Sequence, residues 1–353
     1  MQNKHYMIPR RNLLKKTALG LGLGMGSLTG AKGPLVQAAT PAVYDNAQPR
    51  LPREVWLACV SCEGIEARDP DDMIAKMLAR MEEALPYRPD IICLPENFPC
   101  QCVSRPSLAE ISEVPPGPVT ERFAEFARQH HTHVICATRT KEKGRYYNSA
   151  VVIDRQGKVV GEYRKAHLTT GEMADGLTPG PIDPPVFDLD VGRIGIQICF
   201  DIEYMDGWQR LNEKGAEIVF WPSAFAGGRK LNMLAQLFRY VVVSSTRRNV
   251  NKICDIDGTV AAKTGIWNPY LCCGSVNLEK AFLHTWPFCK RFKEIKAAYG
   301  RKIKITTFHE EEWSIIESRS ADVKISQVLK EYELKTFDEH IKEAEAMQNE
   351  RRL

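Results

Sequence analysis

The chain has 353 residues, of which 44% are hydrophobic and 26% are charged, a composition typical of globular proteins that excludes a largely disordered chain. Its formal net charge at pH 7 is +4, but the first 39 residues contain six basic and no acidic residues, so the remainder carries −2. The basic balance comes from the N-terminal segment and gives no support to nucleic-acid binding.

The N-terminal segment contains the three parts of an export signal in order. Arg10 and Arg11 form a twin-arginine pattern, an apolar glycine-rich stretch covers residues 17–30, and a small-residue site ends at Ala38. The apolar stretch is shorter than the roughly 20 residues that span a bilayer. We therefore expect a twin-arginine signal peptide at residues 1–38, cleaved after Ala38, and a periplasmic or secreted protein without a stable membrane anchor.

After a linker at residues 39–53, short apolar runs alternate with amphipathic helical patterns. One helix is expected to start at Pro70 with Asp69 as its N-cap, and another follows Gly117 and Pro118. Further helices are predicted at residues 207–214 and 231–244. Strands are predicted at residues 55–61, 90–94, 133–137, 147–154, 159–164, 193–200, 217–221 and 272–278. This mixture of βα units and hairpins predicts an α/β fold with mixed sheets.

The C-terminal part of the chain is different in character. Residues 281–353 form a highly charged extension to a predicted catalytic domain at residues 54–280, and residues 322–352 are expected to form one or two solvated helices. Such an extension can be a surface tail, or it can wrap the core or a neighbouring subunit, and the sequence does not choose between these arrangements.

The eleven cysteines provide no metal-binding pattern. Cys59 and Cys62 have zinc-ribbon spacing, but no second pair accompanies them, so we expect neither a metal nor another cofactor. Most cysteines lie in apolar runs and are expected to be buried. Cys100 and Cys102 are the candidates for a disulfide in an oxidising compartment.

Two predicted strands end close to an acid and a thiol. Glu96 follows the strand at residues 90–94 and Pro95, so it should lie just beyond the sheet edge, where partial desolvation raises its pKa and favours a role as a base. In the strand at residues 193–200, alternation places Cys199 on the face opposite the three isoleucines. Taken singly, each residue has a structural alternative, because such acids often cap loops and such cysteines often pack in cores.

A third segment joins a strand to a loop rich in ionisable groups. Lys165 follows the strand at residues 159–164, and Glu172 lies seven positions later. By itself this pattern is also typical of a solvated basic loop. His167 invites a comparison with Cys–His proteases, but no matching cysteine signature or downstream His/Asn pair supports it.

Together these segments resemble the nitrilase, or carbon–nitrogen hydrolase, superfamily. The family pattern has a glutamate after an apolar strand and a proline, a lysine in a Lys-x-His-Leu setting, a second glutamate soon after, and a cysteine ending a Gly-x-x-x-Cys strand. Glu96, Lys165, Glu172 and Cys199 match these positions in order. The resemblance covers about residues 55–278. It implies a four-layer α-β-β-α sandwich with mixed sheets that assembles as a homodimer or higher homo-oligomer.

The resemblance implies a catalytic triad whose chemistry is consistent with the residue types. Glu96 removes the proton of Cys199, Lys165 favours the thiolate, and the sulfur attacks an amide or nitrile carbon. The Lys165 ammonium and the backbone N–H of Phe200 stabilise the developing negative charge, a contribution of about 3–4 kcal/mol for such donors. Glu96 then protonates the departing amine and activates water against the thioester. Glu172 organises Lys165 or that water.

The substrate class follows less directly. Asn148, Trp221, Ser223 and Phe225 lie where such folds place pocket walls, although they can equally be packing residues. Nitrilases of this family usually carry tryptophan after the cysteine, and Phe200 stands there in this chain. An amidase or N-carbamoyl hydrolase is therefore favoured over a true nitrilase, and the expected partner is a small amide, carbamoyl compound or nitrile. Acyl transfer to another acceptor and a catalytically silent exported scaffold are the alternatives.

Overall fold

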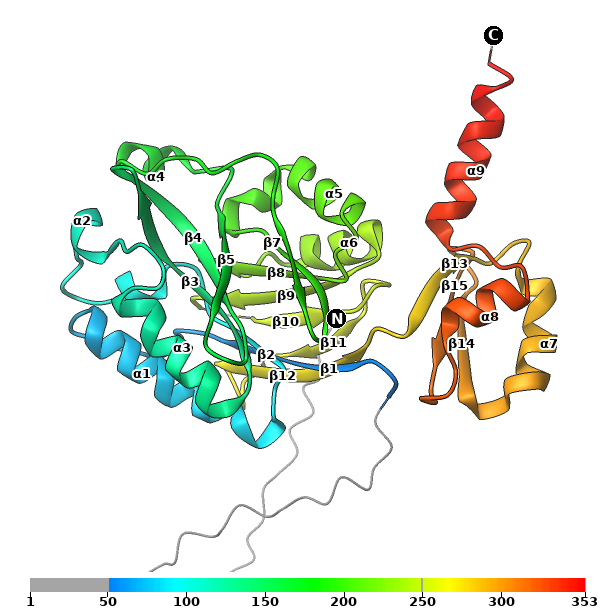
Figure 1. The fold of residues 1–353 in the computed structure, drawn as a ribbon, viewed down its shortest axis with the longest axis horizontal. Helices are drawn as coiled ribbons and strands as arrows, with labels where there is room; N and C mark the ends of the chain where they lie inside the picture. The colour runs from blue at the N-terminus through cyan, green and yellow to red at the C-terminus, as the bar shows by residue number, and fades with distance from the viewer. Residues whose placement is uncertain (1–50, 249, 353) are drawn as a thin grey trace, which may run out of the picture. The chain divides into compact units, whose positions relative to one another are not determined.

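The computed structural model describes residues 51–248 and 250–352 (Figure 1). The predicted signal peptide and most of the predicted linker lie outside these residues. Two six-stranded sheets form the larger part of the structure. Among the described residues, no helix combines the length and apolar character needed to cross a membrane.

The first sheet is mixed, with a parallel centre. Its order is β12 (Leu271–Asn277), β1 (Glu54–Val60), β2 (Ile91–Cys93), β3 (His133–Glu142), β4 (Arg145–Ile153) and β5 (Val159–Arg164). Strands β1, β2 and β3 run parallel, and the other neighbouring pairs are antiparallel. The carboxyl ends of the parallel strands therefore meet at one edge of the sheet, where the chain after β2 carries Glu96.

The second sheet has the same plan. Its order is β11 (Val260–Lys263), β10 (Lys252–Cys254), β9 (Val241–Thr246), β8 (Ile218–Ser223), β7 (Gly192–Ile196) and β6 (Val186–Leu189). Strands β7, β8 and β9 are parallel, with antiparallel strands outside them. Cys199 follows β7. In each sheet, therefore, one candidate catalytic residue lies just after the carboxyl end of a parallel strand.

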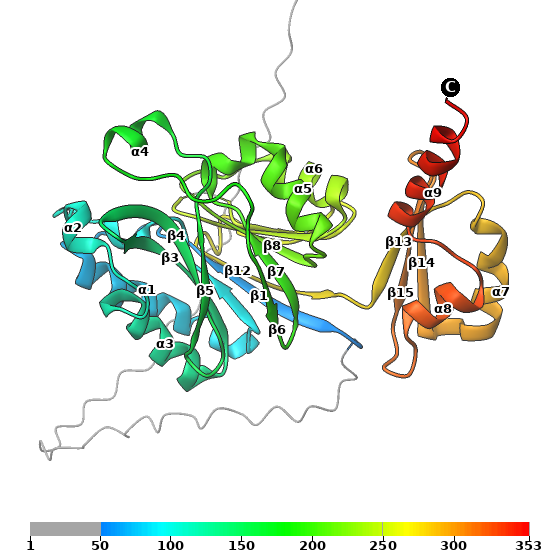
Figure 2. The same ribbon diagram turned by 45° about the horizontal axis from the view of Figure 1, so that its top comes forward.

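Three hydrophobic clusters define four layers, which Figures 1 and 2 show as two sheets with helices outside them. The central cluster joins residues of both sheets, such as Leu57 and Phe220. A second cluster packs α1 (Pro70–Glu82) and α3 (Pro118–His130) on the first sheet, and a third packs α5 (Met205–Glu213) and α6 (Arg229–Phe238) on the second. The predicted α-β-β-α sandwich with mixed sheets is therefore confirmed.

Helix α1 forms as its sequence predicts. The Asp69 side chain accepts a hydrogen bond from the Asp72 backbone at 2.9 Å, and Pro70 occupies the first turn, where no N–H is needed. Met73, Met77 and the other buried residues of this helix face the first sheet. The remaining short helices are α2 (Leu108–Ile111), α4 (Thr170–Ala174), η1 (Leu85–Tyr87), η2 (Phe98–Cys100) and η3 (Cys199–Glu203).

Two predicted elements near the site extend too far. The helix expected at residues 231–244 ends at Phe238, because Arg239 adopts a left-handed conformation, and residues 241–246 form the buried strand β9. The strand expected at residues 193–200 ends at Ile196. Cys199 then starts η3 and belongs to the same hydrophobic cluster as the preceding isoleucines, so the predicted alternation of faces does not extend to it.

The C-terminal extension contains a sheet that the sequence analysis missed. Strands β13 (Lys280–His284), β15 (Trp313–Ser318) and β14 (Ile303–Phe308) pair antiparallel in that order. The helices of this part are α7 (Cys289–Tyr299), η4 (Gly300–Lys302), α8 (Ile325–Glu331) and α9 (Phe337–Asn349). Leu283, Phe292, Ile316 and Val328 are among the residues of its own hydrophobic cluster. Helix α8 is therefore packed and not solvated as expected, whereas α9 has no buried residue.

Candidate active site

Glu96 lies at the end of β2 and is only 2% exposed. Its carboxylate accepts hydrogen bonds from Asn148 Nδ2 at 2.8 Å and from Lys165 Nζ at 2.9 Å. Arg247 donates through Nε to the main-chain oxygen of Glu96 at 2.8 Å, and its Nη2 lies 3.6 Å from the carboxylate. A buried carboxylate is tolerated when it is paired and hydrogen-bonded, and these contacts satisfy that condition.

Lys165 joins two carboxylates. Its Nζ contacts Glu96 Oε1 at 2.9 Å and Glu172 Oε2 at 2.8 Å, and its side chain is 1% exposed. Glu172 is fixed by a capping box at the start of α4, in which Thr169 is the N-cap. Asn148 Nδ2 also donates to Glu172 at 2.7 Å, which closes a network of four side chains.

The backbone at Cys199 has an unusual conformation. Cys199 has a φ of 48°, a left-handed conformation that costs energy in a non-glycine residue and that clusters at functional sites. Trp221 Nε1 donates to the Cys199 carbonyl at 3.0 Å and so helps to hold the turn. The Ser223 hydroxyl and the Ala224 backbone lie near the sulfur and act to lower the pKa of the thiol, against the larger opposing effect of burial. Phe200 follows in the first turn of η3, where N–H groups lack intrahelical partners.

Asp201 connects the cysteine turn to the lysine loop. This fully buried carboxylate accepts from the Ile198 N–H and the Tyr163 hydroxyl, each at 2.8 Å. It also accepts from the His167 N–H at 2.8 Å, and the His167 ring lies 3.1 Å from it. These bonds fix the segment after β5 against the segment after β7. The sequence analysis missed Asp201, although an acid two residues after the cysteine was a visible signal.

The pKa of Glu96 is shifted in the direction opposite to the prediction. Burial raises the pKa of Glu96, but Lys165, Arg247 and Asn148 together hold that pKa below its usual value. The expected raised pKa is therefore wrong, because the counter-charges outweigh desolvation. For Lys165, burial lowers the pKa, but mainly Glu96 raises it to about 12.

Cys199 remains a neutral thiol at neutral pH. Burial and then the Glu96 charge raise its pKa to about 11, although Lys165 acts in the opposite direction. The resting site therefore holds a carboxylate, an ammonium group and a thiol. Attack by the sulfur on a carbon atom would require its proton to leave, and the ionised Glu96 is the neighbouring group able to receive that proton.

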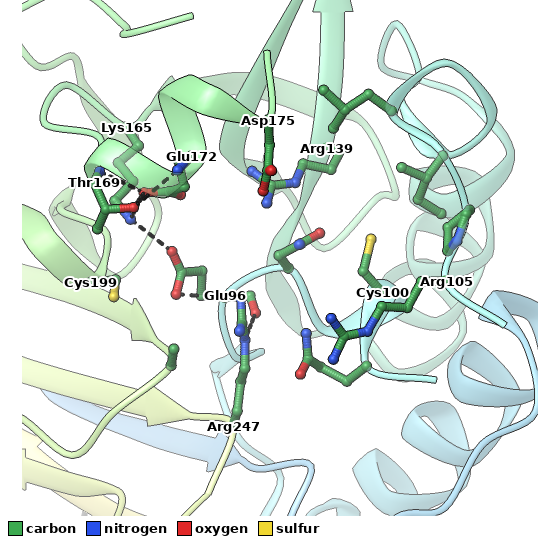
Figure 3. Close-up of a pocket in the computed structure, with 16 residues that line it drawn as sticks. Glu96, Cys100, Arg105, Arg139, Lys165, Thr169, Glu172, Asp175, Cys199 and Arg247 are labelled. Carbon is green, nitrogen blue, oxygen red and sulfur yellow. Dashed lines mark hydrogen bonds and ion pairs between the residues drawn. The ribbon is translucent and has the colours of Figure 1, made fainter. Parts of the chain in front are cut away.

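These groups line a cavity of about 560 Å³ (Figure 3). Glu96, Lys165, Glu172 and Cys199, which the sequence analysis selected, all contribute to its wall. The described wall does not include the four residues predicted to bind substrate. Asn148, Trp221 and Ser223 are buried, and Phe225 is 40% exposed. Asn148 and Trp221 contact the catalytic candidates as described above. Substrate binding by these four residues stays a prediction.

The wall contains charged residues that the sequence analysis missed. Arg105, Arg139 and Arg247 line the cavity together with Cys100 and Asp175. Arg139 lies in the continuation of a strand that was expected to end at residue 137, and this continuation, Thr-Arg-Thr-Lys-Glu, is polar and gave no apolar signal. Arg247 follows β9, which was predicted as a helix. All eleven cysteines are free thiols, including Cys100 and Cys102.

Comparisons with known proteins identify the family of this chain. The sequence matches the family described as Carbon-nitrogen hydrolase over residues 57–237. A nitrilase from Pyrococcus abyssi is 31% identical over 158 residues, which is 44% of this chain and 60% of the relative. Omega-amidase NIT2 from Homo sapiens is 27% identical over 163 residues, which is 44% of this chain and 58% of that protein. The chain thus spans about three fifths of the length of these two relatives.

Solved structures share the fold at lower identity. An amidase from Nesterenkonia sp. has a TM-score of 0.56 at 19% identity, covering 64% of this chain and 91% of the amidase. Saccharomyces cerevisiae Nit3 has a TM-score of 0.56 at 19% identity, covering 71% of this chain and 96% of Nit3. The family match covers just over half of the chain and contains Glu96, Lys165 and Cys199. The chain belongs to the carbon–nitrogen hydrolase family.

Proposed function

We propose that this protein hydrolyses the C–N bond of a small amide or N-carbamoyl compound through a thioester on Cys199. The main observation in support is that Lys165 contacts the buried carboxylate of Glu96 and the partly buried carboxylate of Glu172 in the wall of the cavity that Cys199 also lines. One carboxylate can then accept the thiol proton while the ammonium group remains available to a developing oxyanion. The amidases named among the relatives support the amide class for this chain.

The steps follow from the resting charges. The Cys199 sulfur bonds to the carbonyl carbon as its proton passes to Glu96, which is ionised before the attack. The oxygen gains negative charge and is stabilised by Lys165 and the Phe200 N–H. When the tetrahedral intermediate collapses, the C–N bond breaks and Glu96 returns the proton to the nitrogen, releasing ammonia or an amine.

Hydrolysis of the thioester completes the cycle. A water molecule gives a proton to Glu96 as its oxygen bonds to the acyl carbon. The C–S bond then breaks, and Glu96 passes that proton to the sulfur, which regenerates the thiol and the Glu96 carboxylate and releases a carboxylic acid. Glu172 holds Lys165 in place through its 2.8 Å contact, so its role is positioning. Acyl transfer to an amine or hydroxyl instead of water is the alternative outcome of the same intermediate.

Ammonia release from a panel of primary amides, N-carbamoyl amino acids, N-acyl amines and nitriles tests the substrate class. Cys199→Ala is expected to abolish release, and Cys289→Ala, which removes a thiol of the C-terminal extension, is the matched control. Mass spectrometry during turnover should find an acyl adduct on the Cys199 peptide. Substantial activity in Cys199→Ala would exclude Cys199 as the nucleophile. Wild-type protein that is inactive on the whole panel would exclude this proposal and favour the silent scaffold.

The proposal also includes export by the twin-arginine route to the periplasm or beyond. It rests on the order of the basic, apolar and small-residue parts within residues 1–38, which lie outside the described residues. A folded precursor is compatible with this route, and the assembled site needs no cofactor for the steps above. Cell fractionation tests this part separately from activity.

A further inference from the structure

The loop between β11 and β12 carries two exposed apolar side chains at its tip. Ile266 is 84% exposed and Trp267 is 93% exposed. Single exposed apolar residues are ordinary, but tryptophan is highly buried on average in folded proteins. Two adjacent apolar side chains that the fold leaves uncovered therefore indicate a contact surface.

Hydrogen bonds hold the tip in this exposed position. Gly265 and Asn268 exchange backbone hydrogen bonds at 3.1 and 3.2 Å, so Ile266 and Trp267 form a two-residue tip. The Asn268 side chain also accepts from the Leu271 N–H at 3.2 Å, where β12 begins. A loop that is already fixed in an exposed shape loses little conformational entropy when it binds a partner.

The tip lies beside the segment that joins β9 to β10. The Thr264 N–H donates to Asn251 O at 3.0 Å, and Thr264 Oγ1 accepts from the Asn251 N–H at 3.0 Å. Val250, directly before Asn251, is also exposed. Each segment adds an exposed cation, Arg248 after β9 and Lys263 at the end of β11.

Positive charge dominates this region. The chain contains no Asp or Glu between residues 240 and 254 or between residues 258 and 278. The two segments therefore place Arg248 and Lys263 beside the apolar tip without an acid of their own to offset these charges.

A cavity of about 510 Å³ extends from Arg248 toward the active site. The exposed Val103 lies in its wall and adds apolar surface. The charged residues of this wall are Arg105, Arg247, Arg248, Glu63 and Glu66. Arg105 and Arg247 also line the catalytic cavity, so the region of the tip borders the active site.

Six residues together form what we call the tip surface. They are Val103, Arg248, Val250, Lys263, Ile266 and Trp267.

The chemistry of the tip surface fits a bilayer with anionic headgroups. Tryptophan favours the boundary between headgroups and acyl chains, apolar side chains enter that boundary, and Lys and Arg attract anionic lipids. A contact between two copies about a two-fold axis would instead place the same cations close to one another, and like charges repel.

We propose that the tip surface binds this protein peripherally to anionic lipid bilayers, with Ile266 and Trp267 inserted at the boundary between headgroups and acyl chains. Two inserted side chains and a few cations give a reversible attachment. The bound protein holds its catalytic cavity close to the lipid. The proposal does not depend on the proposed hydrolysis.

Quenching of tryptophan fluorescence by brominated lipids tests the insertion in the purified full chain. The vesicles contain dibrominated phosphatidylcholine, either alone or with an equal amount of phosphatidylglycerol. The readout is the quenching that is lost in Trp267→Phe. All proteins compared share residues 1–38, which contain no tryptophan, so this readout reports the tip surface.

The wild-type protein should show Trp267-dependent quenching, and half of it should be reached at about tenfold less lipid with the anionic vesicles. Ile266→Ser should raise that lipid concentration about tenfold, because an apolar side chain no longer enters the lipid. Arg248→Gln combined with Lys263→Gln should remove most of the preference for anionic vesicles.

Two control variants change exposed apolar residues of the C-terminal extension. Ile341→Ser and Trp286→Phe should both leave the Trp267-dependent quenching at the wild-type level. Equal quenching in the wild-type protein and Trp267→Phe, or an Ile266→Ser variant that behaves as the wild type, overturns the proposal. Absent quenching together with a lower molar mass of Ile266→Ser in light scattering also overturns it, and assigns the surface to contacts between copies of the chain.

Discussion

Lys165→Met tests whether the buried charges stabilise one another. Methionine keeps an unbranched side chain but removes the ammonium group, so Glu96 and Glu172 lose their shared counter-charge. Their side chains are 3% and 15% exposed, and that of Lys165 is 1% exposed. Removing one partner from a buried ion pair costs about 3–5 kcal/mol. Asn148 and Arg247 still contact Glu96, so we expect the lower part of this range, about 3 kcal/mol at pH 7.

The expected loss depends on pH with a definite sign. In the wild-type protein the pKa values of Glu96 and Glu172 are lowered, so these groups contribute stability above their unfolded pKa, and that stability is lost as the pH falls through the folded pKa. Without Lys165, burial becomes the main influence and raises both pKa values. The ionised carboxylates of Glu96 and Glu172 then destabilise the Lys165→Met variant at neutral pH, and their protonation at lower pH removes this destabilisation. The difference between the two proteins should shrink from pH 7 toward about pH 4, near the usual pKa of glutamate.

Urea unfolding at pH 7 and at the lowest pH where both proteins stay folded measures this difference. Lys252→Met is the matched control, because the buried Lys252 amine donates to neutral oxygens, Gly228 O at 2.6 Å and Asn232 Oδ1 at 2.8 Å. Its loss should be nearly independent of pH in this range. A loss of unfolding free energy below about 1 kcal/mol for Lys165→Met would refute the reasoning, because exposed ion pairs contribute that little. A loss that is equal at both pH values would refute it as well.

Three other predictions concern chemistry and export. Glu96→Gln and Lys165→Ala should each lower kcat/KM strongly and be non-additive when combined, whereas additive losses in the double-mutant cycle would contradict a shared transition state. Because the pKa of Cys199 is raised to about 11, its alkylation by iodoacetamide in the free enzyme should rise about tenfold per pH unit from neutral to alkaline pH, and a plateau at pH 7 would contradict this. Arg10→Lys with Arg11→Lys should retain the precursor in the cytoplasm, as fractionation would show, and unchanged export would indicate another route.

Local patterns in the sequence determined much of the sandwich. Asp69 and Pro70 mark the start of α1 because an N-cap acceptor and a missing N–H suit the first turn whatever packs around it. The alternation of apolar strand patterns with amphipathic helical patterns predicted the α/β class, because these patterns also depend on residues close together in the sequence. The linked motifs around Glu96, Lys165 and Cys199 were also visible, since each lies beside its own strand end.

Patterns of short range failed where tertiary contacts decide the conformation. Residues 241–246 continue the apolar pattern of α6, but they form β9 because they pair with β8 and β10 inside the second sheet. The left-handed turn at Cys199 similarly depends on partners remote in sequence. Its carbonyl is held by Trp221, and Asp201 ties the turn to Tyr163 and His167.

The pKa shifts of the site residues depend on the tertiary structure. The sequence alone indicated that Glu96 is an acid at a strand end, but the direction of its pKa shift depends on Lys165 and Arg247, which are far away along the chain. Propensity and periodicity act over a few residues, whereas desolvation and ion pairing depend on distances in space, and only the assembled sheets bring these groups together.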